Sequence, residues 1–211
     1  MDLGISANLA PLLEQVKTLI TREVVPLERE YLDEIATGDR WQFTPRQTEI
    51  MQCLKAKARD QGLWNFFLTD GEAGSGLTTV EYAYLAEEMG KSHIAAEVFN
   101  CSAPDTGNME VLHKYGSEAQ KKQWLEPLMN GEIRSAYAMT EPKVASSDAT
   151  NICTEAVLDG DEWVINGEKH YVSGAGDPRC KIMIVMVKTD PEAPKHLQQS
   201  QILVPTDAAG F

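Results

Sequence analysis

The stretch AYAMTEPKVASSDA, residues 136–149, marks the point at which the pattern of the sequence changes. Before it, apolar residues recur with the period of a helix, and after it they form short runs typical of strands. We therefore predict an α+β chain: an N-terminal all-α helical domain over residues 1–135, followed by an antiparallel β domain over residues 136–211.

Helical periodicity is clearest between residues 9 and 24, where leucine, isoleucine and valine recur at i, i+3 and i+4. This stripe predicts a helix that ends near Pro26, because proline lacks the N–H group that a helix interior needs. Further helices are expected to begin where Ser or Thr precedes Glu or Gln by three positions, the pattern of a capping box. These pairs are Thr44 and Gln47, Thr78 and Glu81, and Ser117 and Gln120, with Gly62 and Gly90 marking helix ends.

Beyond residue 150 the sequence favours strands joined by tight turns. The dipeptides Asp159-Gly160 and Asn166-Gly167 are favoured in two-residue hairpin loops, and they interrupt NICTEAVLDGDEWVINGEKHYVSG, residues 151–174. KIMIVMV (181–187) and QILVP (201–205) continue the strand pattern. These features predict an antiparallel arrangement.

Composition excludes several classes of function. The 211 residues carry 19 Lys and Arg against 32 Asp and Glu, a formal charge of −13, which repels nucleic acid and anionic membranes. The four cysteines form no CxxC pair and the four histidines are scattered, so we expect free thiols and no metal site. The N-terminus lacks the basic and apolar regions of a signal peptide, and no run approaches the ~18 apolar residues of a membrane span. A soluble intracellular protein is expected.

A search of the sequence for generic catalytic motifs does not identify a function. GEAGSG, residues 71–76, has neither the GxGxxG spacing after a strand nor the Lys-Ser/Thr of a P-loop, so a flexible loop is the better interpretation. The sequence contains no GxSxG elbow and no HExxH helix, and therefore no evident nucleophile.

Two motifs in order carry a resemblance to a known family. AYAMTEPKVASSD (136–148) followed by DEWVINGEKHYVSGAG (161–176) resembles the middle domain of the acyl-CoA dehydrogenases. GLTTVEYAYLAEEMGKS (76–92) and MEVLHKYGSEAQKKQWLEPLMNGE (109–132) are similar to the helical N-terminal segments of that family, so the resemblance runs from about residue 9 to the end. The sequence is most similar to the branch of this family that in animals is often found C-terminal to a phosphotransferase-like domain.

The resemblance implies FAD as cofactor and assigns residues to it. Tyr137 and Met139 would make packing or backbone contacts to the flavin, and Thr140 would bond its pyrimidine edge. Ser146 and Ser147 would contact pyrophosphate or ribose, with Ser147 also touching the acyl-CoA substrate. In the second motif the residues implied to flank the flavin are Tyr171, Val172 and Ser173, with Ser173 placed to reach N5.

Each assignment has an ordinary structural alternative. Thr140-Glu141-Pro142 alone is typical of a turn in which Thr140 caps the chain and proline fixes φ. Tyr171 alone would more often be strand core, and Ser173 a strand end. The sequence also departs from the family pattern T-E-P-G-A-G-S-D, since the loop here is one residue longer and lacks both glycines, and Tyr171 replaces the common tryptophan.

The resemblance further implies a reaction and its partners. Family members are about twice as long and carry the catalytic glutamate base in a C-terminal helical domain that is absent here. The chain is therefore expected to be an N-terminal fragment whose β domain is a partial antiparallel β-barrel. Such a fragment is expected to be inactive alone, because it has no catalytic residue of its own, and Glu141 is not assigned as the base. The implied function is α,β-dehydrogenation of an acyl-CoA, with electron-transfer flavoprotein as acceptor, in a homodimer or homotetramer. Location would be cytoplasmic in a bacterium, or mitochondrial or peroxisomal in a eukaryote. The alternatives are an acyl-CoA oxidase or flavin monooxygenase of the same fold, and a non-catalytic fragment that binds full-length partners.

Overall fold

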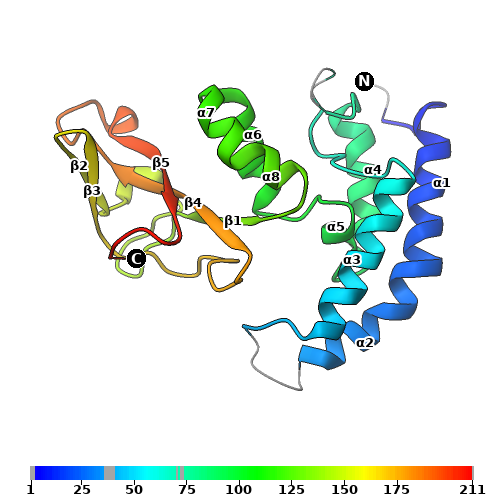
Figure 1. Ribbon diagram of the computed structural model, residues 1–211. Coiled ribbons are helices and arrows are strands. Elements are labelled where there is room, and N and C mark those ends of the chain that lie inside the picture. The colour runs from blue at the N-terminus through cyan, green and yellow to red at the C-terminus, as the bar shows by residue number, and fades with distance from the viewer. Residues whose placement is uncertain (1–2, 36–40, 70, 72–73, 211) are drawn as a thin grey trace. The chain divides into compact units, whose positions relative to one another are not determined.

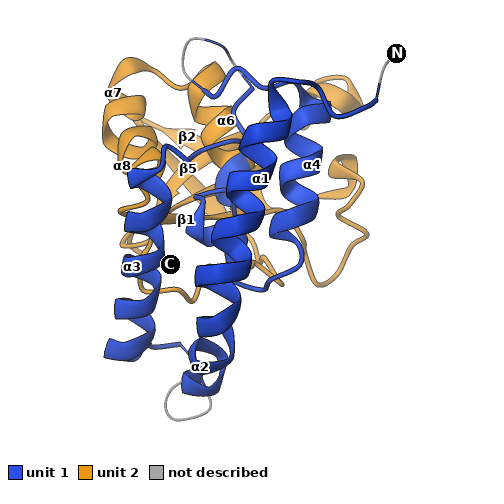
Figure 2. Cartoon of the chain, turned by 90° about the vertical axis from the view of Figure 1, so that its right-hand side faces the viewer, with its two compact units in different colours: residues 1–106 blue, residues 107–211 orange. Residues whose placement is uncertain are grey.

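The computed structural model describes residues 3–35, 41–69, 71 and 74–210, and the chain divides into two units (Figure 2). Unit 1 spans residues 1–106 and unit 2 spans residues 107–211. Unit 1 is helical, and unit 2 begins with short helices and continues into a sheet (Figure 1). The fold class predicted from the sequence, helices followed by a partial barrel, is confirmed.

Unit 1 begins with a long helix that does not end near Pro26 as predicted. Helix α1 (Leu9–Leu19) continues through a π-helical turn, Ile20–Val24, into α2 (Val25–Ile35). In that turn the N–H of Val25 bonds the carbonyl of Ile20, one residue further back than in an α-helix, which widens the helix ahead of the proline ring. Unit 2 repeats this arrangement, because a π-helical turn (Lys121–Leu125) precedes Pro127 at the same offset.

The predicted helix starts are confirmed by their caps. Thr44 opens α3 (Pro45–Asp60): its hydroxyl accepts a hydrogen bond from the Gln47 N–H, and the Gln47 side chain accepts one from the Thr44 N–H. The same reciprocal box opens α4 (Thr79–Met89) and α7 (Glu118–Gln120). Gly62 follows α3 with φ of +69°, a conformation that glycine adopts without strain.

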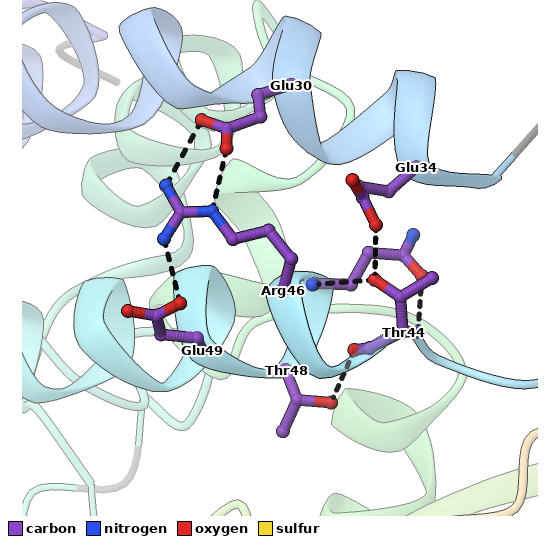
Figure 3. Close-up of polar contacts among 7 residues, drawn as sticks. Glu30, Glu34, Thr44, Arg46, Thr48 and Glu49 are labelled. Carbon is purple, nitrogen blue, oxygen red and sulfur yellow. Dashed lines mark hydrogen bonds and ion pairs between the residues drawn. The ribbon is translucent and has the colours of Figure 1, made fainter. Parts of the chain in front are cut away.

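Polar contacts join α2 to the start of α3 (Figure 3). The Arg46 guanidinium donates to Glu30 on α2 at 2.7 Å and to Glu49 on its own helix at 2.8 Å. The Thr44 hydroxyl donates to Glu34 at 2.7 Å. These groups are partly or fully exposed, so water and salt screen each pair and it contributes little to stability. The apolar core dominates: α1 packs against α4, α2 against α3, and α3 against α5 (Ala95–Val98).

Unit 2 contains a mixed sheet rather than the purely antiparallel one predicted. β1 (Arg134–Ala138) pairs parallel with β4 (Cys180–Lys188), while β4 pairs antiparallel with β5 (Gln199–Pro205). β2 (Glu155–Asp159) and β3 (Glu162–Asn166) form the hairpin predicted at Asp159-Gly160, and β2 meets β4 only at Glu155 and Lys188. The other elements are α6 (Asp105–Tyr115), whose first turn contains the boundary between the units, α8 (Glu126–Met129) and the 3-10 turns Ala149–Asn151 and Lys195–Leu197.

One face of this sheet carries a buried cluster, which we call the sheet cluster. Side chains alternate along a strand, so residues two apart share a face. The partly buried Val172, Ile202 and Val204 pack against the cluster. Its members are Ala136, Ala138, Ala156, Cys180, Met183, Val185 and Val187.

Within the described residues, no helix is long and apolar enough to cross a membrane. The same part of the chain holds no group of three or more His, Cys, Asp or Glu side chains placed to bind a metal ion. All four cysteines are free thiols.

Candidate functional site

The candidate site begins where β1 ends. Ala136 and Ala138 point into the sheet cluster, so Tyr137 lies on the opposite face, where it is partly buried. Burial raises the pKa of its phenol above the ordinary value. The phenol oxygen accepts a long hydrogen bond, 3.4 Å, from the Gln201 side chain on β5. After the strand, Thr140 is exposed while its neighbour Glu141 is buried.

Glu141 is the centre of a hydrogen-bond network that joins three segments of unit 2. Its Oε2 accepts from the Cys153 N–H at 2.7 Å, and its Oε1 accepts from the Thr154 N–H at 2.9 Å. The ammonium group of Lys169 lies 2.9 Å from the same Oε1, and both side chains are at most 10% exposed. We call Glu141 with these three donors the Glu141 network. It connects the end of β1, the approach to β2 and the chain after β3.

The network fixes the charge of the Glu141 carboxyl group. Burial on its own would raise the pKa, but donation by Lys169 and by the N–H groups of Thr154 and Cys153 lowers it to about 2. Hydrogen bonds to the charged form of an acid favour that form. Glu141 is therefore a carboxylate at neutral pH.

The chain after β3 runs beside the end of β1. The His170 N–H donates to the Thr140 carbonyl at 2.8 Å, and Lys169 donates a second hydrogen bond, 3.1 Å long, to the Met139 carbonyl. These contacts bring together segments about 30 residues apart, which are the two motifs singled out in the sequence. The partly buried Met139 thus uses its backbone to hold Lys169.

Gly167 allows this approach, and the predicted hairpin turn at Asn166-Gly167 is wrong. β3 ends at Asn166, residues 167–172 form neither a turn nor a strand, and the next turn comes only at residues 173–176. A Cβ at Gly167 would lie 2.3 Å from the hydroxyl oxygen of Thr154 and 2.6 Å from its Cβ. Glycine is needed here for close packing against Thr154. The chain then runs beside the end of β1 before β4 pairs parallel with that strand.

The loop after Pro142 is closed by Ser146. Its hydroxyl accepts a hydrogen bond of 2.8 Å from the Glu141 N–H, and its own N–H donates to the Val144 carbonyl at 2.9 Å. The side chain is buried, whereas the neighbouring Ser147 is exposed. The structure gives Ser146 a role in the loop, and its assignment to the cofactor stays a prediction.

The second motif forms a strand only in its first part, β3, and the strand that the sequence indicated around Tyr171 is absent. Tyr171 has φ of +54°, in the left-handed region that is unfavourable for residues other than glycine. Its side chain is 81% exposed, and the ring stacks on His170 with the centroids 3.8 Å apart. Val172 packs against the sheet cluster, so it can face a ligand only through its backbone, and Ser173 is exposed.

A pocket of about 280 Å³ lies beside the network, within unit 2. It is lined by Glu141, Pro142, Lys143, Cys153, Thr154, Gly167 and Glu168.

Sequence reasoning missed the contributions of Lys169, Thr154 and Gly167. Lys169 and Gly167 lie inside the second motif, in I-N-G-E-K. The sequence does not show which residue each of them contacts, so their roles could not be inferred from it. No sequence pattern could identify Thr154, because it takes part in the network through its backbone N–H, which every residue except proline has.

Comparison with known proteins places this geometry in a family. The sequence profile "Acyl-CoA dehydrogenase, N-terminal domain" matches residues 9–132, and "Acyl-CoA dehydrogenase, middle domain" matches residues 136–211. The chain belongs to the acyl-CoA dehydrogenase family. Both motifs of the site lie within the middle-domain match. The two profile matches meet between residues 132 and 136, whereas the two structural units meet between residues 106 and 107. The predicted domain boundary between residues 135 and 136 therefore stays a prediction.

Individual relatives agree with this assignment. Mouse "Acyl-CoA dehydrogenase family member 10" is 52% identical over 213 residues, which covers 99% of this chain and 20% of the mouse protein. A solved structure from Mycobacterium abscessus is 52% identical with a TM-score of 0.91, covering 98% of this chain and 52% of that one. An acyl-CoA dehydrogenase from Bacillus anthracis complexed with FAD is 28% identical with a TM-score of 0.65, covering 97% of this chain and 32% of that one. The acyl-CoA dehydrogenase chain described here thus spans about half, or less, of the length of these relatives.

Proposed function

We propose that the protein catalyses FAD-dependent α,β-dehydrogenation of an acyl-CoA thioester, and that this chain supplies one wall of the flavin site. The observation that carries the proposal is the meeting of the two motifs. The His170 N–H donates to the Thr140 carbonyl with an N···O distance of 2.8 Å, so the exposed Thr140 lies beside the chain that continues into Tyr171 and Ser173. We infer that the hydroxyl groups of Thr140 and Ser173 and the ring of Tyr171 face one surface.

The groups exposed at this surface fit the chemistry of a flavin. A flavin ring is a flat apolar body with a polar edge, so its site needs an apolar or aromatic wall and a few hydrogen-bonding groups. Tyr171 offers an aromatic ring that is 81% exposed, and its left-handed backbone is the kind of local strain found at ligand sites. Thr140 and Ser173 offer exposed hydroxyl groups that can act as donors or acceptors.

Each residue then has a proposed task. Thr140 would bond the pyrimidine edge of the ring through its hydroxyl and N–H, and Ser173 would reach N5. Ser147, exposed on the loop after Glu141, would contact the acyl-CoA and the ribose or pyrophosphate. The remaining wall residues, in backbone or packing roles, are Tyr137, Met139, Ser146, Tyr171 and Val172.

Bound FAD would supply the two-electron acceptor that removal of two hydrogens from a thioester requires. The residues of this chain would hold and orient the ring and keep one of its faces away from water. In the complete reaction, electron-transfer flavoprotein would be the next acceptor, and the protein would work as a homodimer or homotetramer. Membership of the acyl-CoA dehydrogenase family is the ground for proposing these partners.

The test uses the protein produced at its natural length. We expect a yellow preparation with about one FAD per chain that oxidises acyl-CoA substrates in the presence of an artificial electron acceptor. A preparation that neither retains nor rebinds FAD would contradict the proposal. Rapid reoxidation of the reduced protein by air would instead identify an oxidase with the same fold.

A further inference from the structure

Few hydrogen bonds fix the relative position of the two motifs near Thr140 and Tyr171. β1 ends at Ala138, and residues 167–179 form no strand, so the sheet ladder does not connect the segments that carry Thr140 and Tyr171. Val172 packs against the sheet cluster, which includes Ala136 and Ala138 of β1. The hydrogen bonds that join the two segments are the backbone bond from His170 to Thr140 and the two bonds donated by Lys169. One side chain thus donates two of these three hydrogen bonds.

Lys169 and Glu141 hold the segment after β3 against the end of β1. The lysine donates to the Met139 carbonyl and to Glu141 Oε1, so a single cation holds both the backbone and the side chain at the end of β1. The side chains of Lys169 and Glu141 are 10% and 5% exposed. A buried pair of this kind is screened much less by salt and water than an exposed pair.

We propose that Glu141 and Lys169 are positioning residues for the flavin: their ion pair sets the separation between Thr140 and the Tyr171–Ser173 segment. The inference rests on the proposed function, because it assumes that both segments face FAD. The charge pair acts through its neighbours, since Thr140 directly precedes Glu141 and Tyr171 lies two residues after Lys169. Loss of either charge frees the second segment to move against the first.

Several observations argue against other roles for this pair. Both oxygens of Glu141 already accept hydrogen bonds, and the low pKa of the carboxyl group makes it a poor proton acceptor. The pair also differs from an ordinary core contact, because donors from two other segments converge on one carboxylate. Proteins commonly pre-organise a ligand site with supporting side chains that do not touch the ligand but hold the residues that do.

The experiment compares variants of the natural-length protein by titrating apoprotein with FAD and recording the visible spectrum of the bound flavin. We expect Lys169→Met to weaken FAD binding by about 10- to 100-fold and to change the shape of the flavin absorbance band. The control is Lys121→Met. Lys121 also pairs with a carboxylate, Glu118, at 2.9 Å, but Glu118 is 91% exposed. This variant removes the same charge and should bind FAD as the unaltered protein does.

A second variant keeps the test decisive if Lys169→Met does not fold. Glu141→Gln combined with Lys169→Met leaves no unpaired charge in the buried network, and we expect it to fold yet show the same weakened affinity and altered spectrum. If folded variants bind FAD with unchanged affinity and spectrum while melting at a lower temperature, the pair is merely structural and the inference is overturned. If the unaltered protein binds no FAD, the proposed function itself fails, which is a separate result.

Discussion

Lys169→Met should also destabilise unit 2 in the absence of any ligand, by an amount that the structure lets us work out. The substitution keeps most of the apolar volume of the side chain and removes only the ammonium group. That group donates to Oε1 of the buried Glu141 and to the carbonyl of the partly buried Met139. The Glu141 carboxylate would keep only the N–H groups of Cys153 and Thr154.

The pKa of Glu141 gives the scale of the loss. A value lowered from 4.5 to about 2 means that the fold favours the charged form over the neutral form by about 3 kcal/mol. Lys169 is the largest of the favourable contributions. We therefore expect the variant to lose about 2–3 kcal/mol at pH 7, close to the lower end of the range for breaking a buried pair.

The sign of the pH dependence follows from the same shift. Because the pKa of Glu141 is lower in the folded chain, its contribution is fully present above pH 4.5 and is lost as the pH falls from 4.5 to about 2. Below that range the carboxyl group is neutral with or without Lys169. The difference between the variant and the unaltered chain should therefore be largest near neutral pH and shrink below pH 4.5.

Amide hydrogen exchange measures this loss at its source. The N–H groups of Cys153 and Thr154 both donate to Glu141, so their protection reports on the network. A loss of 2–3 kcal/mol corresponds to exchange that is faster by about 30- to 150-fold at these positions. Lys121→Met, which breaks an exposed pair of the same N···O distance, should leave both amides unchanged. Equal effects of the two substitutions would refute the argument that burial gives the Glu141 pair its strength.

The remaining predictions concern the loop and its packing. Gly167→Ala should cost about 1–3 kcal/mol in urea unfolding, because the new Cβ overlaps a buried side chain at 2.3 Å. Ser146→Ala should lower stability by about 1–3 kcal/mol by leaving the buried N–H group that it caps without an acceptor. Ser147→Ala, at an exposed position, should leave stability within about 0.5 kcal/mol but raise the KM for acyl-CoA. Thr140→Val should weaken FAD binding by about 1 kcal/mol, measured by flavin titration.

Matched controls exist for these predictions. Gly107→Ala introduces a methyl group in α6, where the Cβ would meet nothing within 4 Å, and it should be neutral or stabilising by up to about 1 kcal/mol. An equal loss in Gly107→Ala and Gly167→Ala would show that backbone effects, not the overlap, explain the result. Unchanged flavin affinity in Thr140→Val would leave Thr140 as a turn residue only.

The sequence predicted those features of the fold that depend on local chemistry. Capping boxes at Thr44, Thr78 and Ser117 need residues only three positions apart, and all three are present in the structure. The helix end at Pro26 was wrong because a π-helical turn accommodates the proline, and the sequence has no simple sign of such a turn. The hairpin at Asn166-Gly167 was wrong because this glycine serves a contact with a distant threonine.

The candidate site was predicted in the same uneven way. The motifs identified the two segments, and the structure shows that they meet. Periodicity could not show that Tyr171 adopts a left-handed backbone or that Ser146 turns its hydroxyl into its own loop. Such details depend on which backbone groups remain unpaired after folding, which requires the three-dimensional arrangement.

The chemistry of Glu141 also limits what this wall of the site can do. Dehydrogenation of a thioester needs a base for the α-proton, and an efficient base has a free lone pair and a pKa near the working pH. Glu141 meets these requirements poorly, because three donors already bond its two oxygens and its pKa is about 2. Its charge is instead used within the fold, to hold Lys169 and the segment that follows it. In the proposed reaction this part of the chain therefore orients the reactants, and the proton must be taken by a residue other than the glutamate of the T-E-P motif.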